Sequence, residues 1–129
     1  TTLPAMARIF VVTDEPWVRN EVHAALSVPG VELADHSDPA TVAADAIEAN
    51  AAAVIVDLQV GSMGGMAVAR SIRNAEAHKA EVLVVLLLDR RADAFLAGRA
   101  GADAWVTKPF TARELRDAVG PIASLQERV

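Results

Sequence analysis

A run of seven consecutive apolar residues, 82–88, is the feature that most limits the fold of this chain. A strand that is apolar on both faces occurs where helices cover both sides of a parallel sheet. Shorter apolar runs at 9–12, 54–56 and 104–107 predict three more buried strands. Segment 31–34 alternates between apolar and polar residues, as a half-exposed edge strand does. The chain is therefore expected to form five strands.

The segments between these strands show helical periodicity. The first places Val18 and Val22 on one face, and Pro16 lies near its first turn, where proline is tolerated. Further helices are predicted at 38–50, 65–75, 91–100 and 111–126. Asp38 is expected to cap the second helix. Gly120 and Pro121 are expected to kink or shorten the last one.

Regular alternation of strand and helix predicts a parallel sheet with helices on both faces. The most continuous apolar strands belong in the centre of the sheet, which favours the strand order 2-1-3-4-5. The expected fold is thus a doubly wound, five-stranded α/β structure, a flavodoxin-like three-layer sandwich. In such sheets ligands bind at the carboxyl ends of the strands, where the strand order reverses.

Polar residues follow three of the predicted strands at that edge. Asp14 comes after the first strand, Asp57 after the third and Lys108 after the fifth. Two converging carboxylates repel each other, and oxygen ligands of this kind suit Mg²⁺. A carboxylate beside a divalent cation and an ammonium group can act as a nucleophile toward a phosphoryl donor. Pro109 would fix the turn that directs Lys108, and a Lys–Pro bond is one of the few that adopt the cis form.

Composition excludes several other classes of protein. A chain of 129 residues and 13.6 kDa is expected to form one domain over 1–129, with 1–6 as a loose lead-in. The net charge of -5 argues against binding to nucleic acid. No apolar run approaches the ~20 residues that span a bilayer, and no signal peptide opens the sequence. The chain contains no cysteine, which excludes disulfides and thiolate metal sites. A cytoplasmic protein fits these properties.

The combined motifs resemble the receiver domain of bacterial two-component response regulators over nearly the whole chain. The matching segments are 12–16 after the first strand, Asp57 after the third, the glycine-containing loop 61–65, Gly101-Ala102-Asp103, and Lys108-Pro109-Phe110. Their order and spacing together are specific, although each motif alone is weak.

The resemblance implies that a histidine kinase or phosphotransfer protein phosphorylates Asp57. Mg²⁺ would be held by Asp14, Asp57 and the backbone carbonyl of Gln59, and Lys108 would assist the transfer. The protein would be no enzyme beyond slow self-catalysed phosphotransfer and dephosphorylation. We expect a single receiver domain without an output domain, so the signal would pass to a downstream protein partner. The family's usual partner surface corresponds here to 92–99, Trp105 and 113–123.

Two departures from the family pattern bear on the mechanism. In the acidic cluster formed by Thr13, Asp14 and Glu15, threonine replaces the first of the usual acids, which implies weaker Mg²⁺ binding. By spacing from Lys108, Leu86 occupies the switch position where Ser or Thr is usual, and Trp105 occupies the aromatic switch position. A hydrogen bond to a charged group contributes ~1.5–3 kcal/mol, a large part of the ~5.5 kcal/mol that drives a two-state switch nearly to completion.

Two alternative functions stay open at this point. A pseudo-receiver would keep the fold and the partner surface but signal without phosphorylation, which Thr13 and Leu86 favour. A small α/β enzyme or flavin carrier would share the fold. The sequence lacks the glycine-rich phosphate loops of such proteins, and aromatic residues make up 4% of it.

Overall fold

The computed structural model describes residues 7–75 and 82–120. Within these residues, five strands alternate with five α-helices. The strands are β1 (Ala7–Val12), β2 (Val31–His36), β3 (Ala53–Asp57), β4 (Leu83–Leu88) and β5 (Ala104–Thr107). The helices are α1 (Pro16–Leu26), α2 (Val42–Glu48), α3 (Gly65–Ala75), α4 (Ala94–Arg99) and α5 (Ala112–Ala118), and a 3₁₀ turn, η1 (Arg91–Asp93), precedes α4.

All five strands form one parallel sheet in the order β2-β1-β3-β4-β5, which confirms the predicted topology. The central strands β3 and β4 are buried almost throughout, whereas β2 is partly exposed along its length. The strand order reverses between β1 and β3, so the carboxyl ends of these two strands flank the expected ligand position.

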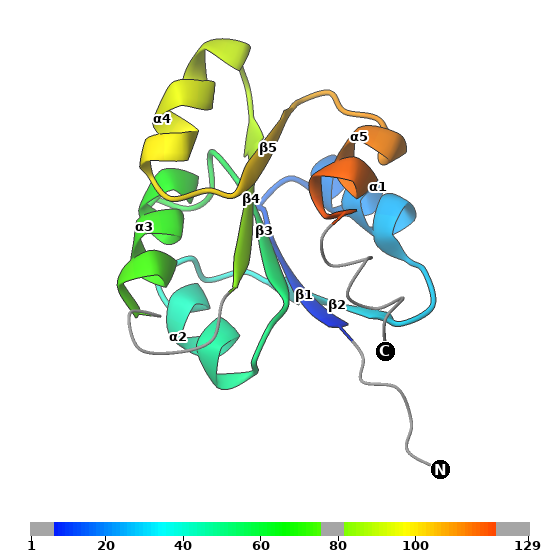
Figure 1. Cartoon of the computed structure of the whole chain (residues 1–129), viewed down its shortest axis with the longest axis horizontal. Coiled ribbons are helices and arrows are strands. Elements are labelled where there is room, and N and C mark those ends of the chain that lie inside the picture. The colour runs from blue at the N-terminus through cyan, green and yellow to red at the C-terminus, as the bar shows by residue number, and fades with distance from the viewer. Residues whose placement is uncertain (1–6, 76–81, 121–129) are drawn as a thin grey trace.

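Helices cover both faces of the sheet and create two apolar cores. Helices α2, α3 and α4 lie on one face, and α1 and α5 lie side by side on the other (Figure 1). Alternate residues of β1, β3 and β4 enter opposite cores, as the period of two in a strand requires. In β4, for example, Leu86 and Leu88 pack toward α3, while Val85 and Leu87 pack toward α1 and α5. This two-sided burial explains why the run 82–88 contains no polar residue.

One predicted helix boundary is wrong. The second helix begins at Val42 rather than at 38, because the Asp38 carboxylate accepts a hydrogen bond from the amide of Ala40 (3.0 Å) within a turn that precedes the helix. The last helix contains α5 (Ala112–Ala118), and its predicted end at 126 lies outside the described residues. The predicted lead-in 1–6 and Pro121 lie outside the described residues.

The helices in 7–75 and 82–120 are all too short or too polar to cross a membrane.

Candidate functional site

The carboxyl ends of β1, β3 and β5 bring three polar side chains together. Asp57, the last residue of β3, is fully buried. Its Oδ1 forms an ion pair with Nζ of Lys108, the first residue after β5. Its Oδ2 accepts a hydrogen bond from the hydroxyl of buried Thr13 at 2.9 Å. Both oxygens of this buried carboxylate therefore have a donor, as a charge removed from water requires.

Lys108 lies between two carboxylates. Besides Asp57, its ammonium contacts Oδ1 of Asp89 at 3.0 Å, and only 10% of its side chain is exposed. Burial alone lowers the pKa of Lys108, but hydrogen bonds to Asp57 and Asp89 outweigh burial, so the pKa is raised above its ordinary value. Lys108 is thus a permanent cation at neutral pH. The peptide bond between Lys108 and Pro109 is cis.

Asp14 lies at the same edge of the sheet but is hydrogen-bonded to a different element. Its Oδ2 accepts a hydrogen bond from the amide of Gly61 at 2.7 Å, in the loop after β3. Gly61 has φ +54, a backbone conformation that suits glycine. Glu15 is exposed, and its backbone amide donates to the Thr13 hydroxyl at 3.1 Å. Of the cluster 13–15, only Thr13 therefore contacts Asp57 directly.

The oxygen donors at this edge suit Mg²⁺ in their chemistry but are few in number. Asp14 and Asp57 are the two carboxylates that flank the switch point, and the chain between Asp57 and Gly61 supplies backbone carbonyls there. Within the described residues, no group of three or more Asp, Glu, His or Cys side chains is close enough to hold a metal ion. The donor set fits a weakly held Mg²⁺ that completes its shell with water.

Leu86, the predicted switch position, is fully buried near the carboxyl end of β3. It pairs with Val56 and Trp105, one position before the level of Asp57. A Cβ on Gly65 would lie 2.5 Å from the carbonyl oxygen of Asp57 and 3.0 Å from Cδ2 of Leu86. Strand β4 continues to Leu88, which is equally buried and whose carbonyl accepts the hydrogen bond from the amide of Lys108 (2.7 Å). Neither leucine carries a hydroxyl.

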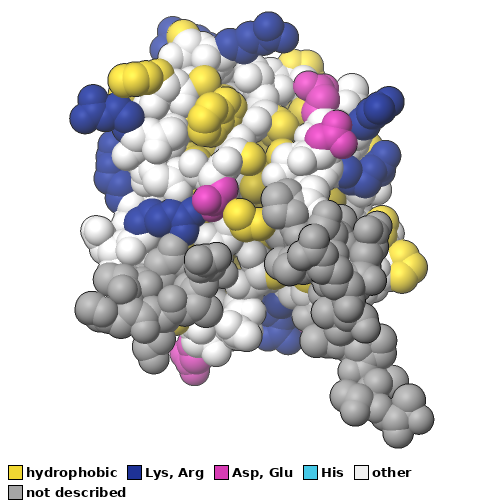
Figure 2. Space-filling model, in the orientation of Figure 1, with side chains coloured by type: hydrophobic (Ala, Val, Ile, Leu, Met, Phe, Trp, Pro, Cys, Tyr) yellow, Lys and Arg dark blue, Asp and Glu magenta, His cyan; other side chains and the backbone are white. Residues whose placement is uncertain are grey.

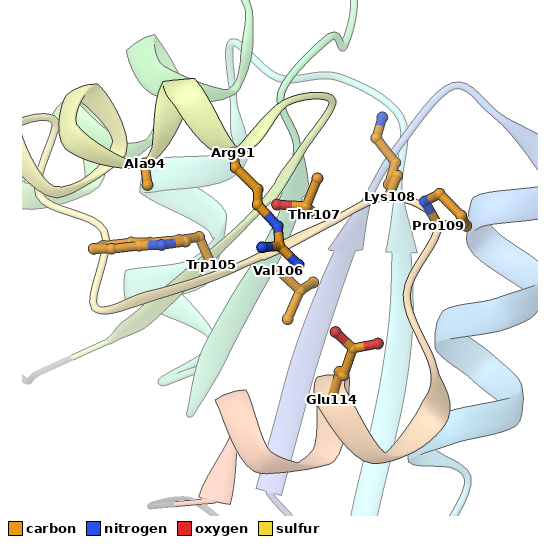
Figure 3. A pocket seen from close by; sticks show the side chains of 8 residues that line it. All are labelled: Arg91, Ala94, Trp105, Val106, Thr107, Lys108, Pro109 and Glu114. Carbon is orange, nitrogen blue, oxygen red and sulfur yellow. The ribbon is translucent and has the colours of Figure 1, made fainter.

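Trp105 lies outside the buried cluster, on the side of α4. Its ring packs over Gly98, where an added Cβ would meet ring atoms at 3.5 Å, and 39% of the residue is exposed. The ring lies flat beside Ala94 (Figure 3). Phe95 and Leu96 of α4 are also exposed. On the face shown in Figure 2, hydrophobic side chains gather toward the middle, with Lys and Arg mainly at the rim.

A groove of about 570 Å³ runs beside β5 between α4 and α5. The Arg91 and Glu114 side chains extend into it from opposite sides, whereas Lys108 points away from it toward the sheet edge (Figure 3). Glu114 already accepts a hydrogen bond from the amide of Thr111 at 3.0 Å, as part of the capping box that begins α5. Asp57 does not line this groove, whereas Lys108 lines it and also pairs with Asp57.

The motif Gly101-Ala102-Asp103 has a structural role in this fold. The Asp103 carboxylate pairs with Arg73 of α3 and accepts a hydrogen bond from the amide of Val84 at 2.8 Å. Arg73 also donates to the carbonyl of Gly101 at 2.7 Å. Gly101 has φ +99, and a Cβ there would lie 2.6 Å from Cγ of Arg73. The motif thus fixes the start of β5 against α3 and β4.

Sequence reasoning missed Asp89. Its Oδ1 contacts Lys108 and its Oδ2 accepts a hydrogen bond from the side chain of Gln59 at 3.0 Å. The available signal was the same one that identified Asp14 and Asp57, because Asp89 is the first polar residue after the apolar run 82–88. The Gln59 side chain, in contrast to its backbone carbonyl, was not assigned any role.

Comparison with known proteins relates this chain to response regulators. Aerobic respiration control protein ArcA of Escherichia coli (strain K12) is 30% identical over 109 residues, which cover 83% of this chain and 44% of ArcA. Sensory transduction protein RegX3 of Mycobacterium tuberculosis (strain H37Rv) is 30% identical over 110 residues, which cover 85% of this chain and 48% of RegX3. The chain therefore spans less than half the length of either relative.

Solved structures agree with this relationship. A LuxR-family response regulator from Aurantimonas sp. SI85-9A1 has a TM-score of 0.77 at 27% identity, covering 93% of this chain and 86% of that one. Response regulator TrrA from Thermotoga maritima, solved in complex with Mg²⁺-BeF, has a TM-score of 0.76 at 28% identity, covering 90% and 98%. The family model described as "Response regulator receiver domain" matches residues 9–120. With that match and the observed sheet order, the chain belongs to the receiver domain family of two-component response regulators.

Proposed function

We propose that this chain accepts a phosphoryl group on Asp57 from a histidine kinase or phosphotransfer protein and passes the signal to a downstream protein. Receiver domains are in general signalling modules rather than enzymes. The observation that carries the proposal is the state of Asp57. A fully buried carboxylate bound to one ammonium and one hydroxyl is a costly arrangement that a purely structural role does not need.

Phosphoryl transfer to Asp57 requires little covalent chemistry from the protein. A carboxylate oxygen of Asp57 forms a bond to phosphorus as the bond between phosphorus and the donor's imidazole nitrogen breaks. The imidazole leaves with the electron pair of that bond and takes up a proton. Lys108, held at the same carboxylate, neutralises part of the charge on the transferring oxygens. Thr13 orients Asp57 through the hydrogen bond to Oδ2.

Mg²⁺ belongs to the same proposal. Asp14, Asp57 and the backbone carbonyl of Gln59 would hold it, and the ion would supply positive charge beside the incoming phosphoryl group. TrrA, a relative of similar fold, was solved with Mg²⁺-BeF. Threonine at position 13 leaves one carboxylate fewer than in the family pattern, so we expect Mg²⁺ to bind weakly.

A second candidate function is a pseudo-receiver that signals without phosphorylation. Two observations favour it. Thr13 contacts Asp57 where an acid is usual, and Leu86 of β4 stands where a hydroxyl is usual. Leu86 and Trp105 remain the proposed switch positions.

Intact mass spectrometry after incubation with Mg²⁺ and acetyl phosphate distinguishes the two functions. A working receiver gains a Mg²⁺-dependent phosphoryl adduct that is absent from Asp57→Asn. Asp117→Asn is a matched control, because it removes one carboxylate from the exposed face of α5 and should form the adduct normally. Acetyl phosphate reacts as the imidazole donor does, with acetate as the leaving group. No adduct on the unaltered chain, at millimolar Mg²⁺ and with a cognate kinase domain as donor, would favour the pseudo-receiver.

A further inference from the structure

Asp89 joins the three segments that follow the central strands and β5. It is the first residue after β4, and one of its oxygens is 3.0 Å from Nζ of Lys108. The other oxygen is 3.0 Å from Nε2 of Gln59, in the loop after β3. Its side chain is 38% exposed, so these two contacts, rather than burial, hold it in place.

The ammonium of Lys108 is shared between two carboxylates that differ in their surroundings. Asp57 is fully enclosed and also has the hydroxyl of Thr13, whereas Asp89 reaches solvent. Because Lys108 is almost fully buried and follows a strand, it cannot move far from Asp57. A change of charge on Asp57 therefore alters how strongly Lys108 holds Asp89, which is the more exposed of its two partners.

A phosphoryl group brings about -1.5 to -2 charges and three acceptor oxygens to this position. It would outcompete the single charge of Asp89 for the Lys108 ammonium and repel Asp89 at the same time. Strand β4 ends in Leu86-Leu87-Leu88 and has no hydroxyl that could draw this segment inward. We propose that a phosphoryl group on Asp57 expels Asp89 from Lys108, and that this expulsion moves the segment between β4 and α4.

This inference rests on the proposed phosphorylation of Asp57. It states the direction of the movement, which is away from the phosphoryl group. A hydroxyl at the end of β4 would be attracted by the phosphoryl group, whereas Asp89 is driven away from it. Residues 89–93 lead directly into α4, and the ring of Trp105 packs over Gly98 of that helix. A movement of Asp89 is therefore transmitted to α4 through the short segment 89–93.

The test is a comparison of backbone amide chemical shifts in residues 89–99 before and after treatment with Mg²⁺ and acetyl phosphate. The phosphoryl adduct is measured by intact mass in the same samples. Asp89→Asn keeps the size of the side chain and an oxygen that accepts from Gln59, but it removes the charge. We expect Asp89→Asn to form the adduct while its shift changes fall to less than half of those in the unaltered chain. Asp117→Asn, which removes a charge elsewhere, is expected to respond fully.

A full shift response in Asp89→Asn, or loss of the adduct in Asp89→Asn alone, would overturn the inference and leave the proposed function intact. Absence of an adduct on the unaltered chain would overturn the proposed function, and the inference with it.

Discussion

Replacing Lys108 by methionine removes the cation beside a carboxylate that has almost no contact with water. The Asp57 side chain is 1% exposed, and in Lys108→Met its remaining donor would be the hydroxyl of Thr13. Methionine preserves most of the volume of the lysine stem, so the change reports charge rather than packing. Asp89 is partly solvated and does not add to the cost.

Breaking a buried ion pair by removing one partner destabilises a protein by ~3–5 kcal/mol. The Thr13 hydrogen bond still compensates part of the charge on Asp57, which favours the lower end, about 3 kcal/mol. With a urea m-value of ~2 kcal/mol/M, this loss lowers the unfolding midpoint by about 1.5 M. Mg²⁺ should restore part of the stability in Lys108→Met, because a divalent cation near Asp57 replaces the missing positive charge.

Urea unfolding in chelator-treated buffer, followed by circular dichroism, measures the effect. The double variant Lys108→Met with Asp57→Asn is the matched control. It leaves no buried charge, so its stability should lie within ~1 kcal/mol of the unaltered chain. If Lys108→Met unfolds within ~0.5 kcal/mol of the unaltered chain without Mg²⁺, within the range of neutral surface changes, the buried pair does not have the energetic role assigned here.

Three further predictions concern other parts of the site and fold. Gly65→Ala should lower the free energy of unfolding by ~1–3 kcal/mol in thermal melts, because its Cβ would lie 2.5 Å from the carbonyl oxygen at the end of β3, whereas Gly120→Ala meets no atom within 4 Å and should be near neutral. Thr13→Asp should lower the Mg²⁺ concentration that half-saturates the chain, measured by titration; an unchanged value would contradict the assigned donor set. The hydrogen bond to His36 lowers the pKa of Asp45 below 3.8, so its stabilisation is present above that pH and lost as pH falls through the lowered pKa. Urea midpoints of Asp45→Asn should therefore depend less steeply on pH in that range, and equal slopes would contradict the interpretation.

Sequence patterns predicted the sheet because a strand that is buried on both faces consists of consecutive apolar residues. The run 82–88 and the shorter apolar runs could pack only between two layers of helices, and the observed order β2-β1-β3-β4-β5 confirms this. The same reasoning predicted that Asp57 and Lys108 lie at one edge, since the carboxyl ends of parallel strands meet there.

Features that depend on single hydrogen bonds were harder to predict. Asp38 is of a residue type that often caps helices. Its carboxylate instead closes a turn three residues before Thr41, which is the observed N-cap of α2. Leu86 was assigned the switch position by counting back from Lys108, and that role stays a prediction. Asp89 carries no motif of its own, and only the geometry of Lys108 and Gln59 gives it a function.

The attachment of α4 determines how little energy is needed to displace it. Its one fully buried side chain is Ala97, and its larger residues, Phe95 and Leu96, face solvent. Burial of a methyl-sized group stabilises by only about 0.8 kcal/mol, so local opening of this helix is expected to be frequent compared with global unfolding. A tenfold change in the population of such an opened form requires about 1.4 kcal/mol. We therefore expect that displacement of the segment after β4 changes, at low energetic cost, the surface that α4 offers to a partner.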